Sequence, residues 1–304
     1  MNTQKTLDFR SHRPLAVALG CFDGVHEGHR RLICETNRIA REKSVDSAVF
    51  CFSEPPKNYF FPNSTPTLTS FEEKQRLMSA LSPDILICVD FCEEIAEMSA
   101  ERFFEDIVKN KLNATEVVCG FNYRFGKGGA GDADLLAKLC ADSGIGLTVI
   151  PKISIDGVAV SSSEIRRLLG AGDVSAAAKL LGRHYSINSP VVDGQHLGRT
   201  LGFPTINQLF DSGSTPLRHG VYATRAHIGD EVKGAITNVG VRPTVDGHTL
   251  CAETNIFDFE SDLYGKSVQI EFVEFIRPEQ KFDSVDELKI QVLADIEKAK
   301  KCIL

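Results

Sequence analysis

A segment rich in glycine and histidine, placed between a strand-like run and a helix-like run, most constrains how this chain can fold. Residues 20–29 hold three glycines and two histidines, and the apolar run 15–19 precedes them. Apolar residues at helical spacing follow, over residues 30–40. At such a strand–helix junction an open α/β sheet binds phosphate, because backbone N–H groups are free there and the helix dipole is positive.

The two histidines of this segment, His26 and His29, suit a phosphate ligand. Imidazole donates hydrogen bonds to phosphate oxygens, and its charge can be tuned near neutral pH. The alternative is a glycine turn with two surface histidines, but such turns rarely carry histidines three residues apart at the start of a helix. We therefore expect a phosphate site here.

Strand-like and helical patterns alternate through the first half of the chain. Further buried strands are expected at residues 47–52, 84–90, 117–119 and 147–150, and helices at residues 70–81, 99–111 and 135–140. Residues 53–66 are expected to form a loop, because prolines break regular structure there. The alternation predicts an α/β fold with a parallel sheet, whose ligands gather at the carboxyl ends of the strands. A second glycine-rich loop, residues 120–132, also follows a strand.

A helix that begins near Ser161 offers another possible anion site. Ser161 and Glu164 have the spacing of a capping box. The hydroxyls of Ser162 and Ser163 and the guanidinium of Arg166 also suit an anion at a helix N-terminus. The local pattern alone does not decide between a simple cap and an anion site.

The pattern changes near Gly182, where helical periods stop and short strand-like runs begin. These runs cover residues 187–192, 221–228, 232–239, 249–259 and 268–275. Short strands at this spacing predict a small β-barrel, and Ser284 is expected to cap a terminal helix that packs on it. Because 304 residues exceed the usual size of one hydrophobic core, we predict two domains, residues 1–181 and 182–304.

Two patterns in the second half suit further chemistry. Glycines and a basic residue precede Pro204, Thr205 and Asn207, and hydroxyl and amide oxygens are hard ligands for Mg²⁺. Glu253 is a lone carboxylate in a strand-like segment, and it could deprotonate a substrate hydroxyl. At this point the alternatives stay open: a plain turn at the first place and a solvated strand residue at the second.

Composition narrows the classes of partner. The formal net charge is −7, which argues against nucleic acid as a bulk partner. No apolar run is long enough to cross a bilayer, and the first residues lack the apolar core of a signal peptide. The nine cysteines are scattered without a C-x-x-C pair, which fits a reducing compartment and no structural zinc. We expect a cytoplasmic protein with no membrane partner.

The chain resembles the bacterial bifunctional riboflavin kinase/FMN adenylyltransferase (FAD synthetase) family over essentially its whole length. The first half is similar to HxGH nucleotidyltransferases through Gly20-x-Phe22-Asp23-Gly24-x-His26-x-Gly28-His29, the run 120–126 and Ser161-Ser162-Ser163-x-Ile165-Arg166. The second half is similar to riboflavin kinases through Gly198-Arg199-x-x-Gly202-Phe203-Pro204-Thr205-x-Asn207, the run 238–244, Glu253 and the run 262–265. HxGH alone occurs in other nucleotidyltransferases, whereas its combination with the Pro-Thr-x-Asn barrel is highly specific.

The resemblance implies a Rossmann-like nucleotidyltransferase domain, a β-barrel kinase domain and two reactions. Riboflavin and ATP give FMN and ADP in the barrel, and FMN and ATP give FAD and pyrophosphate in the α/β domain. Thr205 and Asn207 then hold Mg²⁺, and Glu253 activates the ribityl hydroxyl.

The resemblance also implies how the first site works. His26 and His29 steady the phosphates of ATP, and Ser162, Ser163 and Arg166 hold the departing pyrophosphate. Adenylyl transfer needs no covalent enzyme intermediate, so these groups act by positioning and charge stabilisation. The other residues expected to bind nucleotide, flavin or phosphate are Gly20, Phe22, Asp23, Gly28, Asn122, Gly198 and Gly202.

The chain departs from the family pattern at three places. Residues 52–56 read Phe-Ser-Glu-Pro-Pro, where the family has Phe-x-Pro-His-Pro, so a histidine is lost and Glu54 is added. Ser163 replaces a threonine and keeps the hydroxyl, and Asn255 replaces a histidine near Glu253. Two alternatives therefore remain beside the bifunctional enzyme: a riboflavin kinase whose first half has drifted, and a flavin-binding regulator without activity.

Overall fold

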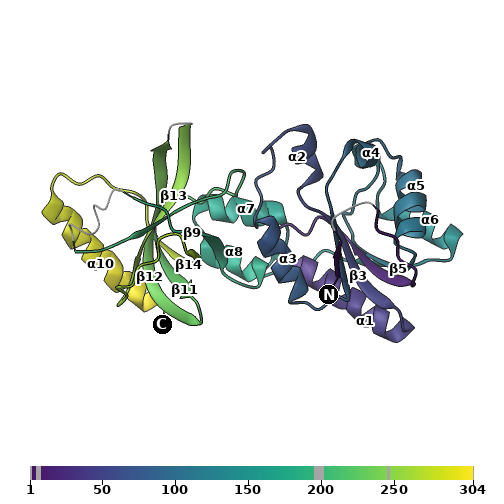
Figure 1. The fold of residues 1–304 in the computed structure, drawn as a ribbon, viewed down its shortest axis with the longest axis horizontal. Coiled ribbons are helices and arrows are strands. Elements are labelled where there is room, and N and C mark those ends of the chain that lie inside the picture. Colours follow the sequence, from purple (N-terminus) through teal and green to yellow (C-terminus); the bar gives the residue numbers. More distant parts are fainter. Residues whose placement is uncertain (1, 5–7, 195–201, 245–246, 304) are drawn as a thin grey trace. The chain divides into compact units, whose positions relative to one another are not determined.

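The chain forms two compact units, Met1–Ser162 and Ser163–Leu304, in a computed structural model (Figure 1). The structure describes residues 2–4, 8–194, 202–244 and 247–303. Helices α7 (Ser162–Ala171) and α8 (Val174–Leu181) precede the domain boundary predicted between residues 181 and 182, which stays a prediction. Over the described ranges, every helix is too short or too polar to cross a membrane.

A six-stranded parallel sheet forms the centre of the first unit, as the alternating pattern predicts. Its strands lie in the order β1 (Asn2–Gln4), β4 (Ile85–Val89), β3 (Asp46–Phe52), β2 (Leu15–Leu19), β5 (Ala114–Gly120) and β6 (Gly146–Ile150). All five residues of β2 are buried, because strands lie on both sides of it and helices cover both faces. β1 was not predicted, since its three polar residues carry no apolar pattern.

Alternate residues of β2 face two separate cores, as the two-residue period of a strand requires. Leu15, Val17 and Leu19 pack in one core with residues of the π-helix η1 (Phe104–Lys111) and of α6 (Ala133–Ser143). Ala16 and Ala18 pack in the other core with residues of α1 (Glu27–Lys43) and α3 (Phe71–Ser79). The sheet is therefore covered on both faces, and ligands reach it at the strand ends.

Serine caps begin two of the helices where the sequence predicts them. Ser70 accepts a hydrogen bond from the backbone N–H of Glu73 at the start of α3, and Ser99 accepts one from Arg102 at the start of α5 (Ala100–Phe103). The predicted loop at residues 53–66 is partly wrong, because it contains the short helix α2 (Pro56–Phe60). A proline in the first turn of a helix lacks only an N–H that has no helical partner. The remaining elements are α4 (Glu93–Ala96), η2 (Lys127–Gly129), β7 (Ser154–Ile155) and β8 (Val158–Ala159).

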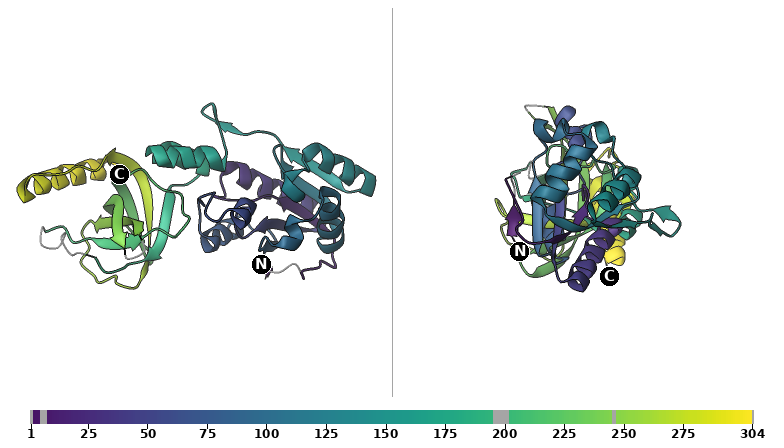
Figure 2. Two further views of the ribbon diagram at one scale, coloured as in Figure 1. Left: turned by 90° about the horizontal axis from the view of Figure 1, so that it is seen from above. Right: turned by 90° about the vertical axis from the view of Figure 1, so that its right-hand side faces the viewer.

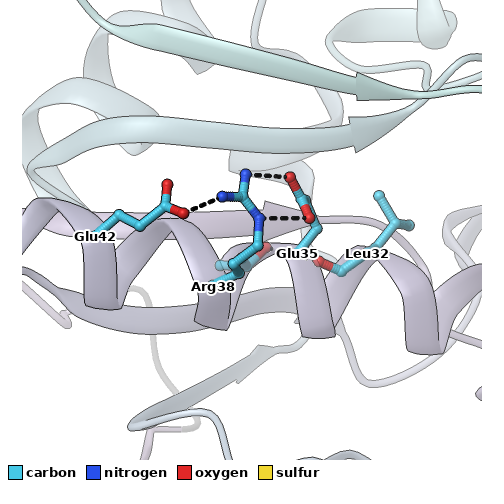
Figure 3. Close-up of polar contacts among 5 residues, drawn as sticks. Leu32, Glu35, Arg38 and Glu42 are labelled. Carbon is cyan, nitrogen blue, oxygen red and sulfur yellow. Dashed lines mark hydrogen bonds and ion pairs between the residues drawn. The ribbon is translucent and has the colours of Figure 1, made fainter.

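The solvent side of α1 carries ion pairs in place of apolar contacts (Figure 3). Arg38 donates from Nε and Nη2 to the carboxylate of Glu35 at 3.0 and 2.7 Å, and from Nη1 to Glu42. The hydrogen bonds from Arg38 lower the pKa of Glu35. Water screens exposed pairs of this kind, so the buried side of α1, which includes Leu32 and Ile33, does more to hold the helix on the sheet.

A six-stranded antiparallel sheet, curved into a nearly closed barrel, forms most of the second unit, as predicted. Its strands lie in the order β10 (Ile206–Leu209), β13 (Gly247–Ile256), β12 (Glu231–Thr244), β11 (Gly220–Ile228), β14 (Ser267–Arg277) and β9 (Tyr185–Pro190). The strand β10 was not predicted. The helix α10 (Val285–Ile303) packs on β11, β12 and β14, and is seen in yellow beside the green strands in Figure 2. Ser284 caps it by accepting from the backbone N–H of Glu287.

The seam of the barrel lies between β9 and β10. An antiparallel bridge joins Val192 to Asn207 across it. The fully buried Gln208 donates from Nε2 to the backbone oxygens of Ser189 and Val268, at 2.6 and 2.8 Å. These side-chain bonds replace part of the missing strand ladder, so the position of β10 is fixed relative to β9 and β14.

Thiol labelling tests this arrangement of the cores. Burial raises the pKa of Cys119 to about 12 and that of Cys140 to about 11, whereas Cys21, Cys34 and Cys302 are exposed. Because the thiolate is the reactive form, we expect iodoacetamide at pH 8 to label the three exposed cysteines and spare the buried pair. Mass spectrometry of the native protein measures this, with denatured protein as control. Equal labelling of the buried pair in the native protein would contradict the packing.

Candidate active sites

The carboxyl end of β2 leads into a turn with an unusual backbone. Phe22, Gly24 and Val25 have φ angles of 53°, 80° and 40°, in the left-handed region. That region is costly for a bulky or β-branched residue, and such strain gathers at functional sites. All of residues 22–26 are buried, so the surrounding structure holds the turn in place.

His26 ends this turn and caps the helix α1. Its Nδ1 accepts a hydrogen bond from the backbone N–H of His29, at 3.2 Å. An imidazole that accepts at Nδ1 carries its proton on Nε2 when neutral, so Nε2 is a hydrogen-bond donor. A Cβ at Gly28 would lie 3.0 Å from the His26 ring, so glycine at this position leaves room for the ring.

His29 stacks on His26 and is kept neutral. The two ring centroids lie 3.6 Å apart, with 12° between the ring planes. Burial, followed by the charges of His26 and Lys74, lowers the pKa of His29 well below 6.5. Its Nδ1 is buried and has no hydrogen-bond partner among the described residues. A buried polar atom without a partner is rare in proteins, and a bound ligand that pairs with it would relieve its cost.

Asp23 and Ser162 have structural partners beside this turn. The Asp23 carboxylate is buried and accepts from the backbone N–H of Leu68 at 2.9 Å, while Ser162 donates to the backbone oxygen of Asp23 at 3.0 Å. Ser163 and Arg166 belong to the second unit. Arg166 lies four residues after Ser162 on α7, so the two share one side of that helix.

Asn122 lies beyond the neighbouring strand of the sheet. It follows β5, whose Cys119 pairs with Leu19 of β2, and it is exposed. Gly20 and Gly120 therefore leave the sheet side by side, and the Asn122 loop begins next to the histidine turn. The expectation that the two glycine-rich loops share one edge of the sheet is confirmed.

In the second unit, strand register places three polar residues in one row. Glu253 on β13 pairs with Asn207 on β10 and with Asn238 on β12. Residues directly opposite each other on neighbouring strands point to the same face of a sheet. The predicted base and one predicted metal ligand are therefore brought together, with an asparagine on the other side.

Two cavities of the second unit have Thr205 in common. A cavity of about 560 Å³ is lined by Thr205, Thr254, Asp262 and Tyr264 among others. A second cavity of about 400 Å³ has Thr205, Glu253 and Asn238 in its wall, with apolar side chains from Phe203, Val221, Ile236, Phe282, Leu288 and Val292. Thr205 is in the wall of both cavities.

Asn255 supports the Thr205 segment. Its Nδ2 donates to the backbone oxygen of Pro204 at 2.8 Å, so the residue that replaces the family's histidine still makes a hydrogen bond. Close packing also limits the chain beside Asn207, because a Cβ at Gly194 would lie 2.2 Å from its Nδ2. Gly202 has a φ angle of +87°, and Gly198 lies outside the described residues.

Sequence reasoning missed several residues near the two sites. Lys74 is buried and its charge lowers the pKa of His29. The buried Asp295 forms an ion pair with the half-buried Arg277, at 2.8 Å, in the wall of the second cavity. Lys74 lies in an ordinary amphipathic helix, so no local pattern distinguishes it. Asn238 belongs to the run 238–244 of the family resemblance, but only the strand register shows that it lies opposite Glu253.

Comparison with known proteins agrees with this two-site architecture. A relative from Escherichia coli K12, a bifunctional riboflavin kinase/FMN adenylyltransferase, is 34% identical over 281 residues, which cover 92% of this chain and 90% of the relative. Family models for FAD synthetase and riboflavin kinase match residues 8–164 and 181–303. The chain belongs to the bifunctional riboflavin kinase/FMN adenylyltransferase family.

Other members and a solved structure extend this comparison. The riboflavin kinase/FMN adenylyltransferase of Bacillus subtilis 168 is 34% identical over 288 residues, covering 93% of this chain and 90% of the relative. The riboflavin kinase/FMN adenylyltransferase of Haemophilus influenzae is 33% identical over 287 residues, which cover 94% of this chain and 93% of the relative. A crystal structure described as a macrolide-efflux protein from Streptococcus pneumoniae has 32% identity and a TM-score of 0.89, covering 98% of both chains. That description is a statement about the streptococcal protein.

The lowered pKa of His29 predicts how the stability of this family member depends on pH. The unfolded state takes up the His29 proton near pH 6.5, before the folded state does. The free energy of unfolding of the first unit should therefore fall as the pH drops below about 6.5. Above that pH, His29 is neutral in both states and should not change the stability. His29→Gln should reduce the fall between pH 7.5 and 5.5, measured by hydrogen exchange of the β2 amides. An equal fall in both proteins would contradict the assignment.

Proposed function

We propose that this chain makes flavin cofactors in two steps. The second unit phosphorylates riboflavin with ATP and releases ADP, and the first unit adenylylates the resulting FMN with ATP and releases pyrophosphate. The row of Asn207, Glu253 and Asn238 beside two cavities that share Thr205 is the observation that carries the proposal. Membership of the family supports both reactions.

The linings of the two cavities support one arrangement of the kinase substrates. The cavity with Glu253 has mostly apolar walls, which suit a planar flavin ring, and its carboxylate suits a ribityl hydroxyl. ATP then takes the larger cavity on the other side of Thr205. Glu253 accepts the hydroxyl proton as that oxygen attacks the γ-phosphorus, and the bond to ADP breaks.

The residues beside Glu253 fit Mg²⁺ as the partner of ATP. Thr205 and Asn207 offer hydroxyl and amide oxygens, and strand register sets Asn207 opposite the Glu253 carboxylate. Mg²⁺ favours oxygen donors and combines one or two protein groups with phosphates and water. When bound, it offsets the charge of the ATP phosphates.

The histidine turn of the first unit suits adenylyl transfer. A phosphate oxygen of FMN attacks the α-phosphorus of ATP, and the bond to pyrophosphate breaks, so charge moves between phosphate oxygens. His26 offers an Nε2 donor and His29 an unpaired ring nitrogen beside the start of α1. The two rings act as phosphate ligands in this proposal, and no covalent intermediate forms.

Other groups of the first site complete the proposal. Ser162, Ser163 and Arg166 at the start of α7 bind the departing pyrophosphate. Gly20, Phe22 and Gly28 shape the turn, and Asn122 contacts the nucleotide or the flavin. We assign Asp23 an indirect part, since its carboxylate accepts from the backbone of Leu68.

The altered segment at residues 52–56 bears on the drifted-kinase alternative. Its added carboxylate, Glu54, is exposed, and the histidine turn keeps both histidines. FAD formation from supplied FMN decides between the two readings. We place both reactions in the cytoplasm, in line with the scattered cysteines of the sequence.

Glu253→Gln tests the kinase site. The amide keeps the size of the side chain but cannot accept the proton, so FMN formation from riboflavin should fall by about 10²–10⁴-fold. FAD formation from supplied FMN should stay unchanged. Both products are measured by chromatography after incubation with ATP and Mg²⁺. A folded variant that keeps its kinase rate, or that loses both reactions, would show that the assignment is wrong.

His29→Ala tests the adenylyltransferase site. Removing a group that stabilises phosphate charge should lower FAD formation from FMN by about 10²-fold, while FMN formation from riboflavin continues. The same chromatographic assay measures both rates in one sample, so the kinase reaction is an internal control. Unchanged FAD formation in a folded variant would remove His29 from the site.

A further inference from the structure

Lys74 on α3 is a buried cation next to the histidine turn. Only 4% of this residue is exposed. Its Nζ donates to the backbone oxygens of Phe52 and Ser53, at 2.7 and 2.8 Å. In the part of the chain that the structure describes, no carboxylate lies within ion-pair distance of Nζ. A buried charge is costly unless it is paired, so a lysine held by two carbonyl dipoles and the ring of Phe71, whose centroid lies 5.9 Å from Nζ, needs an explanation.

The two carbonyl groups belong to the end of β3, the strand beside β2 in the sheet. Ala18 and Leu19 of β2 pair with Val49 and Phe50, so β3 ends next to the histidine turn. A carbonyl oxygen carries partial negative charge, so an unpaired one near this edge would disfavour phosphate. Lys74 takes up two of these oxygens and leaves a net positive charge at the same edge.

The charge of Lys74 also acts on the site residue His29. It lowers the pKa of His29, together with burial and with His26 from the start of α1. These two groups are the ones that act on His29 by charge, one from its own helix turn and one from α3. The Lys74 ammonium is bonded to the end of β3, beside the strand that leads into the histidine turn, so Lys74 and the histidine turn lie at the same edge of the sheet.

We propose that Lys74 is a positioning residue for FMN adenylylation. Its ammonium holds the last carbonyl groups of β3 and supplies a fixed positive charge that favours the ATP phosphates and the departing pyrophosphate. This inference rests on the proposed role of the histidine turn. The proposed role of Lys74 differs from that of a simple cap of β3, because a cap needs only hydrogen-bond donors, whereas the proposed role also needs a positive charge.

Lys74→Gln separates the two roles. The glutamine amide keeps two N–H donors for the carbonyl groups but removes the charge, whereas Lys74→Arg keeps both. We expect Lys74→Gln to lower kcat/KM for ATP in FAD formation by about tenfold. Lys74→Arg should stay within about threefold of the wild type. Lys109→Met, which removes a cation that pairs with Glu105 on η1, is the matched control and should leave both reactions unchanged.

The pH titration of His29 supplies a second readout. In Lys74→Gln the NMR titration midpoint of the His29 ring should move to higher pH, because a neighbouring positive charge is removed. Full adenylyltransferase activity in Lys74→Gln, or an unmoved His29 midpoint, would overturn the inference. If Lys74→Gln fails to fold, Lys74→Arg is the test. The proposal requires the arginine variant to keep both FAD formation and the lowered pKa of His29, so loss of either would overturn it.

His29→Ala, assayed beside these variants, separates this inference from the function on which it rests. If His29→Ala leaves FAD formation intact, the assigned role of the histidine turn fails, whatever Lys74 does. If His29→Ala abolishes FAD formation and Lys74→Gln does not lower it, only the role of Lys74 fails. Riboflavin phosphorylation in the same samples reports the amount of active protein throughout.

Discussion

The parallel pairing of β2 with β3 and β5 is the constraint on which the first site depends. Because all three strands run the same way, the histidine turn, the carbonyl groups bound by Lys74 and the Asn122 loop leave the sheet at one edge. Each group comes from a different part of the chain. The apolar cores on both faces of β2 hold these strand ends in place, so packing far from the ligand sets the geometry near it.

In the second unit, the antiparallel register of the strands brings the site residues together. It sets Glu253 opposite Asn207 and Asn238, while Gln208, one residue further along β10, closes the barrel from inside. A shift by one residue would turn Glu253 into the core and Thr254 out of it. The hydroxyl contacts of Thr237 with Thr224 and Thr254, at 2.8 and 2.9 Å, strengthen this register within the buried interior.

Local patterns predicted most of the elements, because strands and helices of these units bury apolar faces at regular spacing. Several segments were missed, among them β1 and β10, which are short and polar or irregular, and α2, which lies in a proline-rich stretch. His26, His29 and Glu253 could be selected from residue type and spacing. Lys74, Asp295 and its partner Arg277 could not, since a charged residue in an amphipathic helix or strand looks like a surface residue until its neighbours are known.

The sequence by itself determined that a strand, a glycine turn and two histidines meet at a helix start, because three-residue spacing and glycine content are local properties. It also determined the order of an α/β half and a barrel half. Only the tertiary structure decided that Nδ1 of His26 caps the helix, that burial, His26 and Lys74 keep His29 neutral, and that Thr205 lines two cavities. These properties depend on distances between groups far apart in the chain, which packing and strand register set.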